Sequence, residues 1–509
     1  MDVKADGETL TLEEVEAVAR GHARTVVPRD ARSRISQGRR TLEGILKRGD
    51  TVYGVNTGFG NLADTPVSQD EVLELQRRIV LSHAAGVGDP LPPEAVRAAM
   101  LLRINAFSKG HSAVRTRLVD QLLRMLNGGV TPVVRPTGSL GASGDLAPLA
   151  DIALVVMGKG EALDDKGEVI AGAKALRDAG LKPLELAEKE GIALINGTQV
   201  MTGIGTLALL DLERLLRTEL VATAVVADAL GSRRDAYDPR VFEVRPYAGA
   251  RTSAAVLRTL LKGGDLDGCI VKGVQDAYSI RCAPQVVGAA WDATAWARSQ
   301  MEIEINSAGD NPLVFPDEGD HIQGGNFHGQ PVAQALDLLA IAAADIATLS
   351  ERHTNRLMNP ALSGLPAFLA KDPGLDSGLM IAQYTAAALV EEMRALARPA
   401  SVESASTSGD QEDHVSMGMH AALKLTASVE ALRTVVAIEL LAGVQALDFR
   451  APKRPAGPVA AVYNLVRRVV PFYGDDRPLG DDVRRMTELV RLGEVARVVE
   501  RAAGEPLGW

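Results

Sequence analysis

The sequence is poor in cysteine and in aromatic residues, and both shortages limit what kind of protein it can be. Two cysteines, Cys269 and Cys282, are too few for a disulfide framework and show no zinc-finger spacing. Such sparse cysteine usage is typical of a reducing compartment, so we expect a cytoplasmic protein. Phe, Trp and Tyr make up only 4% of the residues, which favours helices rich in Ala, Leu and Val over a large β-sheet.

Further absences exclude several classes of function. The first residues, MDVKADGETLTLEEVEAVAR, lack the apolar core of a secretory signal. The sequence has no window of about 20 residues free of charges, so we expect no membrane span. The formal net charge of −10 argues against nucleic acid or an anionic membrane as a partner. The eight histidines show no His-Glu-x-x-His spacing, and GVNTGFG has the wrong glycine spacing for a dinucleotide site. We therefore expect neither a metal nor a nucleotide cofactor.

What the sequence has in abundance is helical periodicity. Apolar residues recur at intervals of three and four in five long segments: 200–230, 284–305, 332–358, 378–397 and 413–446. This pattern predicts a mainly α fold, with a long helical bundle over 111–509 and a smaller mixed region over 1–110. Stretches such as LDLLAIAAADIATL are apolar around much of the helix, so we infer that subunits share the bundle in an obligate oligomer.

Shorter elements are predicted around this bundle. Thr11 and Glu14 stand at capping-box spacing at the start of a helix over 10–24. Residues 51–63 are expected to form a strand or loop, and 159–185 a small hairpin. Further helices are expected at 28–48, 68–83, 92–107 and 112–127, with one or two charged helices at the C-terminal end.

One short stretch carries unusual chemical potential. Residues 138–150 read GSLGASGDLAPLA, with Ala142, Ser143 and Gly144 at the centre. A tight bend there would bring the Gly144 nitrogen onto the Ala142 carbonyl carbon. Ring closure and loss of water, including the Ser143 hydroxyl, would leave an exposed methylidene, which is an electrophile that no ordinary side chain supplies. The tripeptide alone is common, and by itself it indicates only a Gly-rich loop between helices.

The whole string resembles the signature of the aromatic amino acid ammonia-lyases and aminomutases, and the resemblance spans roughly residues 10–480. That family makes 4-methylidene-imidazol-5-one (MIO) from Ala-Ser-Gly. The resemblance implies that Ala142, Ser143 and Gly144 form MIO autocatalytically. It also implies an amino acid substrate and a homotetramer whose active sites use more than one subunit. Two departures are modest: Gly138-Ser139-Leu140 replaces the more frequent Gly-Ser-Val, and STSGDQEDH differs before its Gln.

Ammonia elimination from an amino acid also needs a strong base for a weakly acidic β-proton. Tyr53, in YGVNTGFG, matches the catalytic tyrosine of the family. A phenol has an ordinary pKa of about 10, so we expect backbone dipoles and cations to lower it. Without the resemblance, Tyr53 would be a half-buried strand residue.

Other matching strings suggest groups that hold the substrate. By resemblance, Asn196 in LINGTQVM lies beside the MIO, although the residues alone indicate a capped helix start. In VQDAYSIRCAPQ the resemblance assigns substrate binding to Gln275 and catalysis to Tyr278. Arg281, three residues after Tyr278, would share a helix face with it and is a natural partner for the substrate carboxylate. A random Arg would more often form a surface ion pair.

The remaining motifs contribute a ring contact and residues of unassigned role. Phe327, in GGNFHGQPV, is expected to pack against the MIO or the substrate ring, though Phe by type is a core residue. His328 and Gln330 beside it have no clear role. The run NSAGDNP at 306–312 is turn chemistry that the family also carries near its site.

Two residues address which ring is bound. His83, in LSHAAGVG, resembles the histidine- and tyrosine-specific members, whereas a lone His is usually a packing residue. Glu412, in QEDHVSMG, resembles the acid that the histidine-specific members place against the substrate imidazole. Glu412 and Asp413 would alternatively cap the helix that follows.

The resemblance therefore implies elimination of ammonia from L-histidine to give trans-urocanate, the first step of histidine degradation. A tyrosine or phenylalanine ammonia-lyase, or an MIO aminomutase, is the alternative within the family. Outside the family, a helical lyase of the fumarase type is disfavoured, because the signature loop of that class is absent from this sequence. A non-catalytic helical scaffold is disfavoured because it would be expected to have lost a catalytic residue, and all are present. A hydrolase using Ser143 is disfavoured because GASGD is not a Gly-x-Ser-x-Gly elbow.

Overall fold

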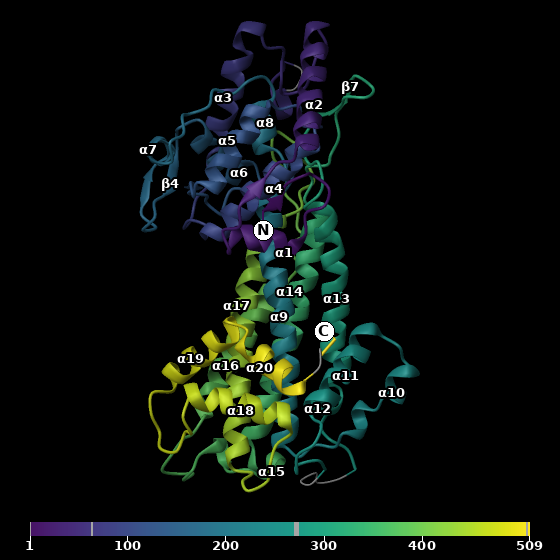
Figure 1. Ribbon diagram of the computed structural model, residues 1–509, viewed down its shortest axis with the longest axis vertical. Coiled ribbons are helices and arrows are strands. Elements are labelled where there is room, and N and C mark those ends of the chain that lie inside the picture. The colour runs from purple at the N-terminus through teal and green to yellow at the C-terminus, as the bar shows by residue number, and fades with distance from the viewer. Residues whose placement is uncertain (1, 63–64, 269–273, 505–506, 509) are drawn as a thin grey trace. The chain divides into compact units, whose positions relative to one another are not determined.

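The computed structural model describes residues 2–62, 65–268, 274–504 and 507–508, so Cys269 lies outside the described residues. The fold is mainly α, as the helical periodicity predicts (Figure 1). The chain forms two compact units. Unit 1 comprises Met1–Ala208, Arg298–Asp337 and Pro399–Leu423, and unit 2 comprises Leu209–Ala297, Leu338–Arg398 and Lys424–Trp509.

This division differs from the sequence-based boundary at residue 110. Each unit gathers three separate stretches of the chain. Four of the five unit boundaries fall inside long helices, α9 (Gln199–Ala229), α13 (Ala283–Glu304), α14 (Gln330–Met358) and α17 (Gly418–Asp448). Periodicity reports where a helix runs, and it does not report where along that helix the packing partners change.

Besides its parts of the long helices, unit 1 contains short and medium helices and three small sheets among its described residues. Its helices are α1 (Leu12–Ala19), α2 (Arg29–Lys47), α3 (Val72–His83), α4 (Pro93–Ser108), α5 (Thr116–Asn127), α6 (Leu146–Val156), α7 (Gly172–Asp178) and α8 (Glu190–Ile195), with 3-10 turns at Gly60–Leu62 and Gln69–Glu71. Its strands are β1 (Val3–Lys4), β2 (Thr25–Val26), β3 (Thr131–Pro132), β4 (Glu161–Leu163), β5 (Val169–Ala171), β6 (Leu313–Phe315) and β7 (Asp320–Ile322). β1 and β2 pair in parallel, and β3-β4-β5 and β6-β7 are antiparallel.

Local sequence signals explain several of these elements. The Thr11 hydroxyl accepts from the Glu14 amide at 3.2 Å while the Glu14 carboxylate accepts from the Thr11 amide at 3.0 Å, so the predicted capping box is formed. The hairpin predicted in 159–185 is β4-β5. α4 is buried along nearly its whole length and packs against α1 and α5, which is why it can contain the wholly apolar run AAMLL at 98–102.

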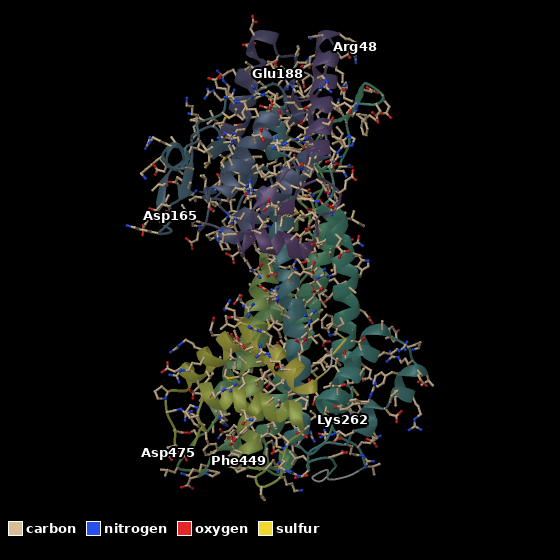
Figure 2. The ribbon with its side chains drawn as sticks, in the orientation of Figure 1. Arg48, Asp165, Glu188, Lys262, Phe449 and Asp475 are labelled. Atoms are coloured by element: carbon tan, nitrogen blue, oxygen red, sulfur yellow. The ribbon has the colours of Figure 1, made fainter. Side chains whose placement is uncertain are left out.

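Unit 2 is almost entirely helical. Besides its parts of the long helices, it contains α10 (Pro239–Glu243), α11 (Ala248–Leu260), α12 (Tyr278–Arg281), α15 (Pro360–Ser363), α16 (Met380–Leu396), α18 (Gly457–Val469), α19 (Leu479–Arg491) and α20 (Glu494–Ala503), with 3-10 turns at Asp235–Tyr237 and Ala367–Leu369. α18 packs against α20 and α11, and α19 against α20. α10, α11, α12, α15 and α18 were not anticipated from the sequence. Charged side chains such as Asp165 of unit 1 and Lys262 of unit 2 point outward from the ribbon (Figure 2).

The long helices follow the predicted segments closely, with one correction. The segment predicted from residue 413 becomes helical only at Gly418. Thr407 and Glu412 exchange backbone hydrogen bonds as an isolated bridge, and Met417 has a φ of +54°, so the chain before Gly418 cannot be helical. α14 is long and apolar enough to cross a membrane, but 72% of its most apolar window is buried within the protein, as in a core helix.

Candidate active site

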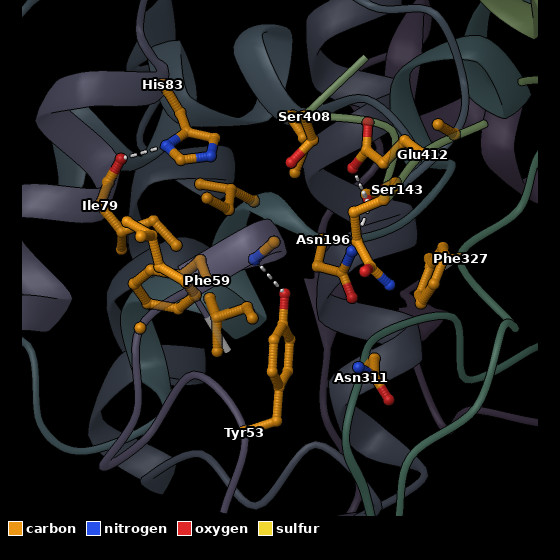
Figure 3. A pocket seen from close by; sticks show the side chains of 18 of the residues that line it. Tyr53, Phe59, Ile79, His83, Ser143, Asn196, Asn311, Phe327, Ser408 and Glu412 are labelled. Carbon is orange, nitrogen blue, oxygen red and sulfur yellow. Dashed lines mark hydrogen bonds between the residues drawn. The ribbon is translucent and has the colours of Figure 1, made fainter. Parts of the chain in front are cut away.

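A cavity of about 810 Å³ in unit 1 brings together residues that are far apart in sequence. Its wall includes Tyr53, His83, Ser143, Asn196 and Glu412. In Figure 3 the Tyr53 hydroxyl, the His83 ring and the Ser143 side chain are directed at one common space. Ala142 and Phe327 also line it. Seven of the eleven residues predicted from sequence motifs therefore surround a single cavity, and Gly144 follows directly in the loop.

The loop that carries Ser143 is held in a backbone conformation that requires glycine. Gly144 has a φ of +77°, and a Cβ on it would lie 2.1 Å from the Gly197 carbonyl oxygen. The Asp145 amide donates to that same oxygen at 2.7 Å. The loop is thus pressed against the Asn196-Gly197 turn, a contact that the Cβ of any other residue at position 144 would prevent.

Asp145 secures this loop to a helix terminus. One carboxylate oxygen accepts from the Val200 and Met201 amides at 2.9 and 2.8 Å, in the first turn of α9, and the other accepts from the Ser139 hydroxyl at 3.0 Å. The side chain is fully buried, and burial raises the pKa of Asp145 to about 6 despite these hydrogen bonds. Asp145 directly follows the Ala-Ser-Gly triplet, yet no sequence pattern predicts a role for it.

Two donors converge on the Ser143 carbonyl oxygen. The Asn196 amide nitrogen Nδ2 donates to it at 2.9 Å and the Gly197 backbone N–H at 3.4 Å. Asn196 ends α8 rather than starting a helix, so its side chain is free for this contact. The Asn196 Oδ1 atom is buried and has no hydrogen-bond partner among the described residues, which leaves one acceptor for a ligand.

A buried arginine fixes the turn that presents Asn196. Arg103 of α4 donates from Nη1 to the Ala193 and Asn196 carbonyls at 3.0 and 2.9 Å, and from Nη2 to Gln199. Burial lowers the pKa of Arg103 to about 10, which still leaves the guanidinium charged at neutral pH. A single charge inside the apolar run LLRINAF is the sequence signal that could have identified this residue.

Glu412 faces the Ser143 side chain. Its Oε1 accepts from the Ser143 hydroxyl at 2.6 Å (Figure 3). Its Oε2 accepts from the Thr407 hydroxyl at 3.1 Å. Glu412 does not cap α17, because it lies in the bridge with Thr407, six residues before that helix begins. The alternative of a capping role is therefore wrong.

Tyr53 is placed by a glycine-rich turn that is fastened to α3 and α8. Gln76 donates to the Gly54 carbonyl at 2.9 Å and accepts from the Gly191 amide at 3.0 Å. The Tyr53 hydroxyl accepts from the Gly60 amide at 3.0 Å. Burial raises the pKa of Tyr53 and the Glu412 charge adds to this, whereas the Gly60 amide lowers it. The expectation that dipoles and cations lower the pKa of Tyr53 is therefore wrong for a single chain. The Gly60 amide dipole lowers this pKa, but burial and Glu412 raise it by more.

His83 ends α3 with a defined tautomer. Its Nδ1 lies 2.8 Å from the Ile79 carbonyl oxygen, which can only accept, so Nδ1 carries the proton. The neutral ring then offers Nε2 as an acceptor. Burial lowers the pKa of His83 and favours this neutral form, while Glu412 opposes the shift.

The remaining predicted neighbours have mixed outcomes. His328 lines the cavity, stacks on His414 with ring centroids 5.8 Å apart, and lies 3.2 Å from the His414 carbonyl. Gln330 instead donates to the Ser401 carbonyl at 3.0 Å. From the turn at 306–312, Asn311 reaches the cavity wall.

Three predicted site residues lie outside this cavity. Gln275, Tyr278 and Arg281 belong to unit 2, on or next to α12. Tyr278 is 73% exposed and Gln275 is exposed as well. The Arg281 guanidinium stands 4.4 Å over the Tyr278 ring, so these two share a face as their spacing predicts. The described residues that line the cavity include no Arg or Lys.

Comparison with known proteins now identifies the family. A family model described as aromatic amino acid lyase matches residues 10–468. The chain belongs to the aromatic amino acid lyase family. Among curated relatives, the histidine ammonia-lyase of Anaeromyxobacter sp. (strain K) is 51% identical, covering 96% of this chain and 98% of the relative. That of Symbiobacterium thermophilum is 49% identical, covering 98% of each chain.

Solved structures of aromatic amino acid lyases and related aminomutases share the fold. The histidine ammonia-lyase from Trypanosoma cruzi superposes with a TM-score of 0.93 at 40% identity, covering 99% of this chain and 96% of that chain. A tyrosine aminomutase from Streptomyces globisporus superposes with a TM-score of 0.95 at 38% identity, covering all of both chains. The mainly α fold predicted from the sequence is confirmed.

Proposed function

We propose that this protein is a histidine ammonia-lyase that converts L-histidine to trans-urocanate and ammonia. The observation that carries the proposal is the presence of His83 and Glu412 in the same cavity as Ser143 and Tyr53. Relatives named as histidine ammonia-lyases, 51% and 49% identical over nearly the whole chain, support it. A tyrosine-specific enzyme is the second candidate, because aminomutases with that substrate share the fold and His83 would also suit a phenol.

The segment Ala142-Ser143-Gly144 fits the formation of an MIO group. Gly144 already holds a left-handed turn without room for a side chain, and the Ser143 hydroxyl is hydrogen-bonded to a carboxylate. When formed, MIO supplies an electrophilic methylidene conjugated with the former Ser143 carbonyl. Asn196 and Gly197 already donate to that oxygen, so they would stabilise negative charge on it in the manner of an oxyanion hole.

Loss of the Ser143 hydroxyl has a consequence for recognition. Glu412 Oε1 would lose its 2.6 Å donor while Thr407 continues to orient Oε2. The freed oxygen is an acceptor for one imidazole N–H of histidine, and Nε2 of the neutral His83 ring is an acceptor for the other N–H when the substrate ring is protonated. A carboxylate against an imidazole N–H is a charge-assisted bond, which gives selectivity over a phenyl ring.

Tyr53 is the base that this proposal assigns to the β-proton. The Gly60 amide already donates to its oxygen at 3.0 Å and would stabilise the phenolate that must form. Burial and Glu412 hold its pKa high in a single chain, so a cation is still needed. The substrate carboxylate needs a cation too.

We assign both needs to Arg281 of another subunit, and therefore propose a homotetramer with shared active sites. Arg281 and Tyr278 stand on an exposed segment, and large apolar side chains are exposed on the long helices, including Trp296 and Ile303 of α13 and Tyr384 of α16. Light scattering tests the assembly. A cytoplasmic location remains part of the proposal and is compatible with the free thiol of Cys282.

A direct assay of histidine, tyrosine and phenylalanine side by side tests the function. The expected product is urocanate from histidine, whereas coumarate from tyrosine as the main product would favour the second candidate. Mixed refolding of the inactive variants Tyr53→Phe and Arg281→Ala tests the shared site. About a quarter of the sites should regain both native residues if they come from different subunits. No recovery would place both residues in one subunit's site.

A further inference from the structure

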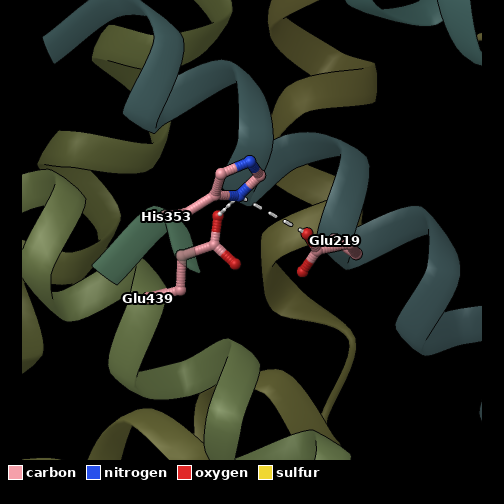
Figure 4. Close-up of side chains that lie close together, drawn as sticks. All are labelled: Glu219, His353 and Glu439. Atoms are coloured by element: carbon pink, nitrogen blue, oxygen red, sulfur yellow. Dashed lines mark hydrogen bonds and ion pairs between the residues drawn. The ribbon is translucent and has the colours of Figure 1, made fainter. Parts of the chain in front are cut away.

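Unit 2 contains a buried charged cluster whose residues do not line the cavity. His353 of α14 lies with its Nδ1 2.8 Å from Glu439 of α17 and 3.8 Å from Glu219 of α9 (Figure 4). All three side chains are fully buried. Buried ionisable groups are costly unless they are paired, so three of them on three long helices call for an explanation.

The protons of the cluster follow from its contacts. His353 Nε2 lies 2.7 Å from the Ser279 carbonyl oxygen, so Nε2 carries a proton that it donates. Burial by itself lowers the pKa of His353. The Glu439 carboxylate and the hydrogen bonds to Glu439 and Ser279 raise it by more, so the pKa lies above its ordinary value. Burial and the Glu439 charge raise the pKa of Glu219 well above its usual value. An imidazolium, one carboxylate and one neutral carboxylic acid make the cluster neutral overall.

The Ser279 carbonyl belongs to α12, the four-residue helix that carries Tyr278 and Arg281. Pro284 follows at the start of α13 and has no backbone N–H, so the Ile280 carbonyl lacks the donor that a continuous helix would supply. The Tyr237 hydroxyl, which is buried, donates to Ile280 at 2.9 Å instead. Two buried side chains therefore hold two consecutive carbonyls of α12.

We propose that His353, charged and clamped between Glu439 and the Ser279 carbonyl, is a positioning residue that fixes α12 and thereby the direction of Tyr278 and Arg281. The inference deepens the proposed function, because it rests on the role assigned there to Arg281. Glu219, as the neutral acid, adds no charge to the His353–Glu439 pair. A rigid α12 matters because Tyr278 is 73% exposed, so little of its own packing holds it in place.

The arrangement argues against a metal ion at the same three side chains. Their ligand atoms lie within 4.8 Å of one another, which by itself would suit a cation. However, Nε2 is turned to Ser279, and Nδ1 is already in hydrogen-bond contact with Glu439. One equivalent of a divalent metal retained by the purified, dialysed enzyme would overturn the proposal.

Two variants of His353 and one matched control test the idea in the full-length enzyme. His353→Leu removes both contacts, whereas His353→Gln leaves an amide N–H that can reach the Ser279 carbonyl. Thr354→Val is the control, because Thr354 is buried on the same helix but bonds only to Ser350 within it, at 3.2 Å.

Hydrogen exchange at the Ile280, Arg281 and Cys282 amides reports α12 directly and needs no activity. His353→Leu should accelerate this exchange by about tenfold or more, His353→Gln less, and Thr354→Val not at all. In histidine turnover, His353→Leu should raise KM about tenfold and also lower kcat, since Arg281 is assigned both the substrate carboxylate and the activation of Tyr53. Unchanged exchange in His353→Leu, or equal acceleration in Thr354→Val, would overturn the proposal. A wild-type enzyme without histidine turnover would refute the proposed function alone.

Discussion

The role of Glu412 gives the sharpest test of substrate choice. Replacing it by Gln in Glu412→Gln keeps the size and a hydrogen-bonding group but removes the negative charge that faces Ser143 at 2.6 Å. If Glu412 binds the substrate imidazole, the variant loses the charged part of that bond. The Thr407 contact at 3.1 Å orients the side chain in the wild type and can still be made to an amide oxygen.

The expected loss can be estimated from this geometry. A hydrogen bond to a charged group is worth about 1.5–3 kcal/mol in protein sites. At about 1.4 kcal/mol per decade, kcat/KM for histidine should fall roughly 10- to 100-fold. Turnover of tyrosine, if detectable, should not fall, because a phenol has no ring N–H and its one O–H donor would bond to Nε2 of His83.

The same variant should move the pH profile in a defined direction. Glu412 raises the pKa of Tyr53 and also that of His83. Removing a negative charge makes ionisation of the phenol easier and protonation of the imidazole harder, so both pKa values fall. The limbs of the kcat/KM profile that report these groups should both shift to lower pH.

The assay needs one control, because Glu412 also contacts the residue that is dehydrated during maturation. The mass of the peptide containing residues 142–144 should show the loss of two waters in each preparation, and rates should be referred to that fraction. A fully matured Glu412→Gln enzyme with kcat/KM for histidine within about twofold of wild type would refute the imidazole assignment.

Three other changes test the rest of the site. Tyr53→Phe should lower kcat by about 100-fold or more with little change in KM, as expected for loss of the base, in a steady-state urocanate assay. Gly144→Ala should cost about 2 kcal/mol or more in denaturant unfolding and block the loss of water in the peptide mass, because its Cβ would lie 2.1 Å from the Gly197 oxygen at a φ of +77°. Asp145 has a folded pKa of about 6 against an ordinary 3.8, so its contribution to stability should be lost as pH rises through that range. Asp145→Asn should remove this pH dependence, which amounts to about 3 kcal/mol at most in the free energy of unfolding. An unchanged pH profile of stability would contradict the burial argument.

Much of the fold could be predicted because its signals are local. The capping box at Thr11 and Glu14 formed as expected, and so did the five long helices. Periodicity missed α12 and α15, which have only four residues each and owe their existence to tertiary contacts. The start of α17 was misplaced because the bridge between Thr407 and Glu412 overrides a helical sequence pattern.

The site residues could be predicted from family motifs, but not from the spacing or chemistry of the residues alone. Tyr53, His83, Ser143, Asn196, Phe327 and Glu412 surround one cavity although they span some 360 residues of sequence. No spacing rule connects them, so only the family resemblance could bring them together before the structure. Asp145 and Arg103 were missed because their roles are carried by backbone groups, the α9 amides and the carbonyls of Ala193 and Asn196. Backbone partners leave little trace in a sequence.

The wrong expectation about Tyr53 indicates how the enzyme would be completed. A single chain buries the phenol beside Glu412, and its described cavity lining holds no Arg or Lys. Histidine brings a carboxylate, which would be unfavourable near Glu412 without a cation. An Arg within about 4–6 Å lowers the pKa of an acid by about 1–3 units. Arg281 from another subunit would therefore bind the substrate carboxylate and at the same time make Tyr53 a usable base. Substrate binding and base activation would then depend on the same guanidinium, which explains why the base need not be ionised before assembly.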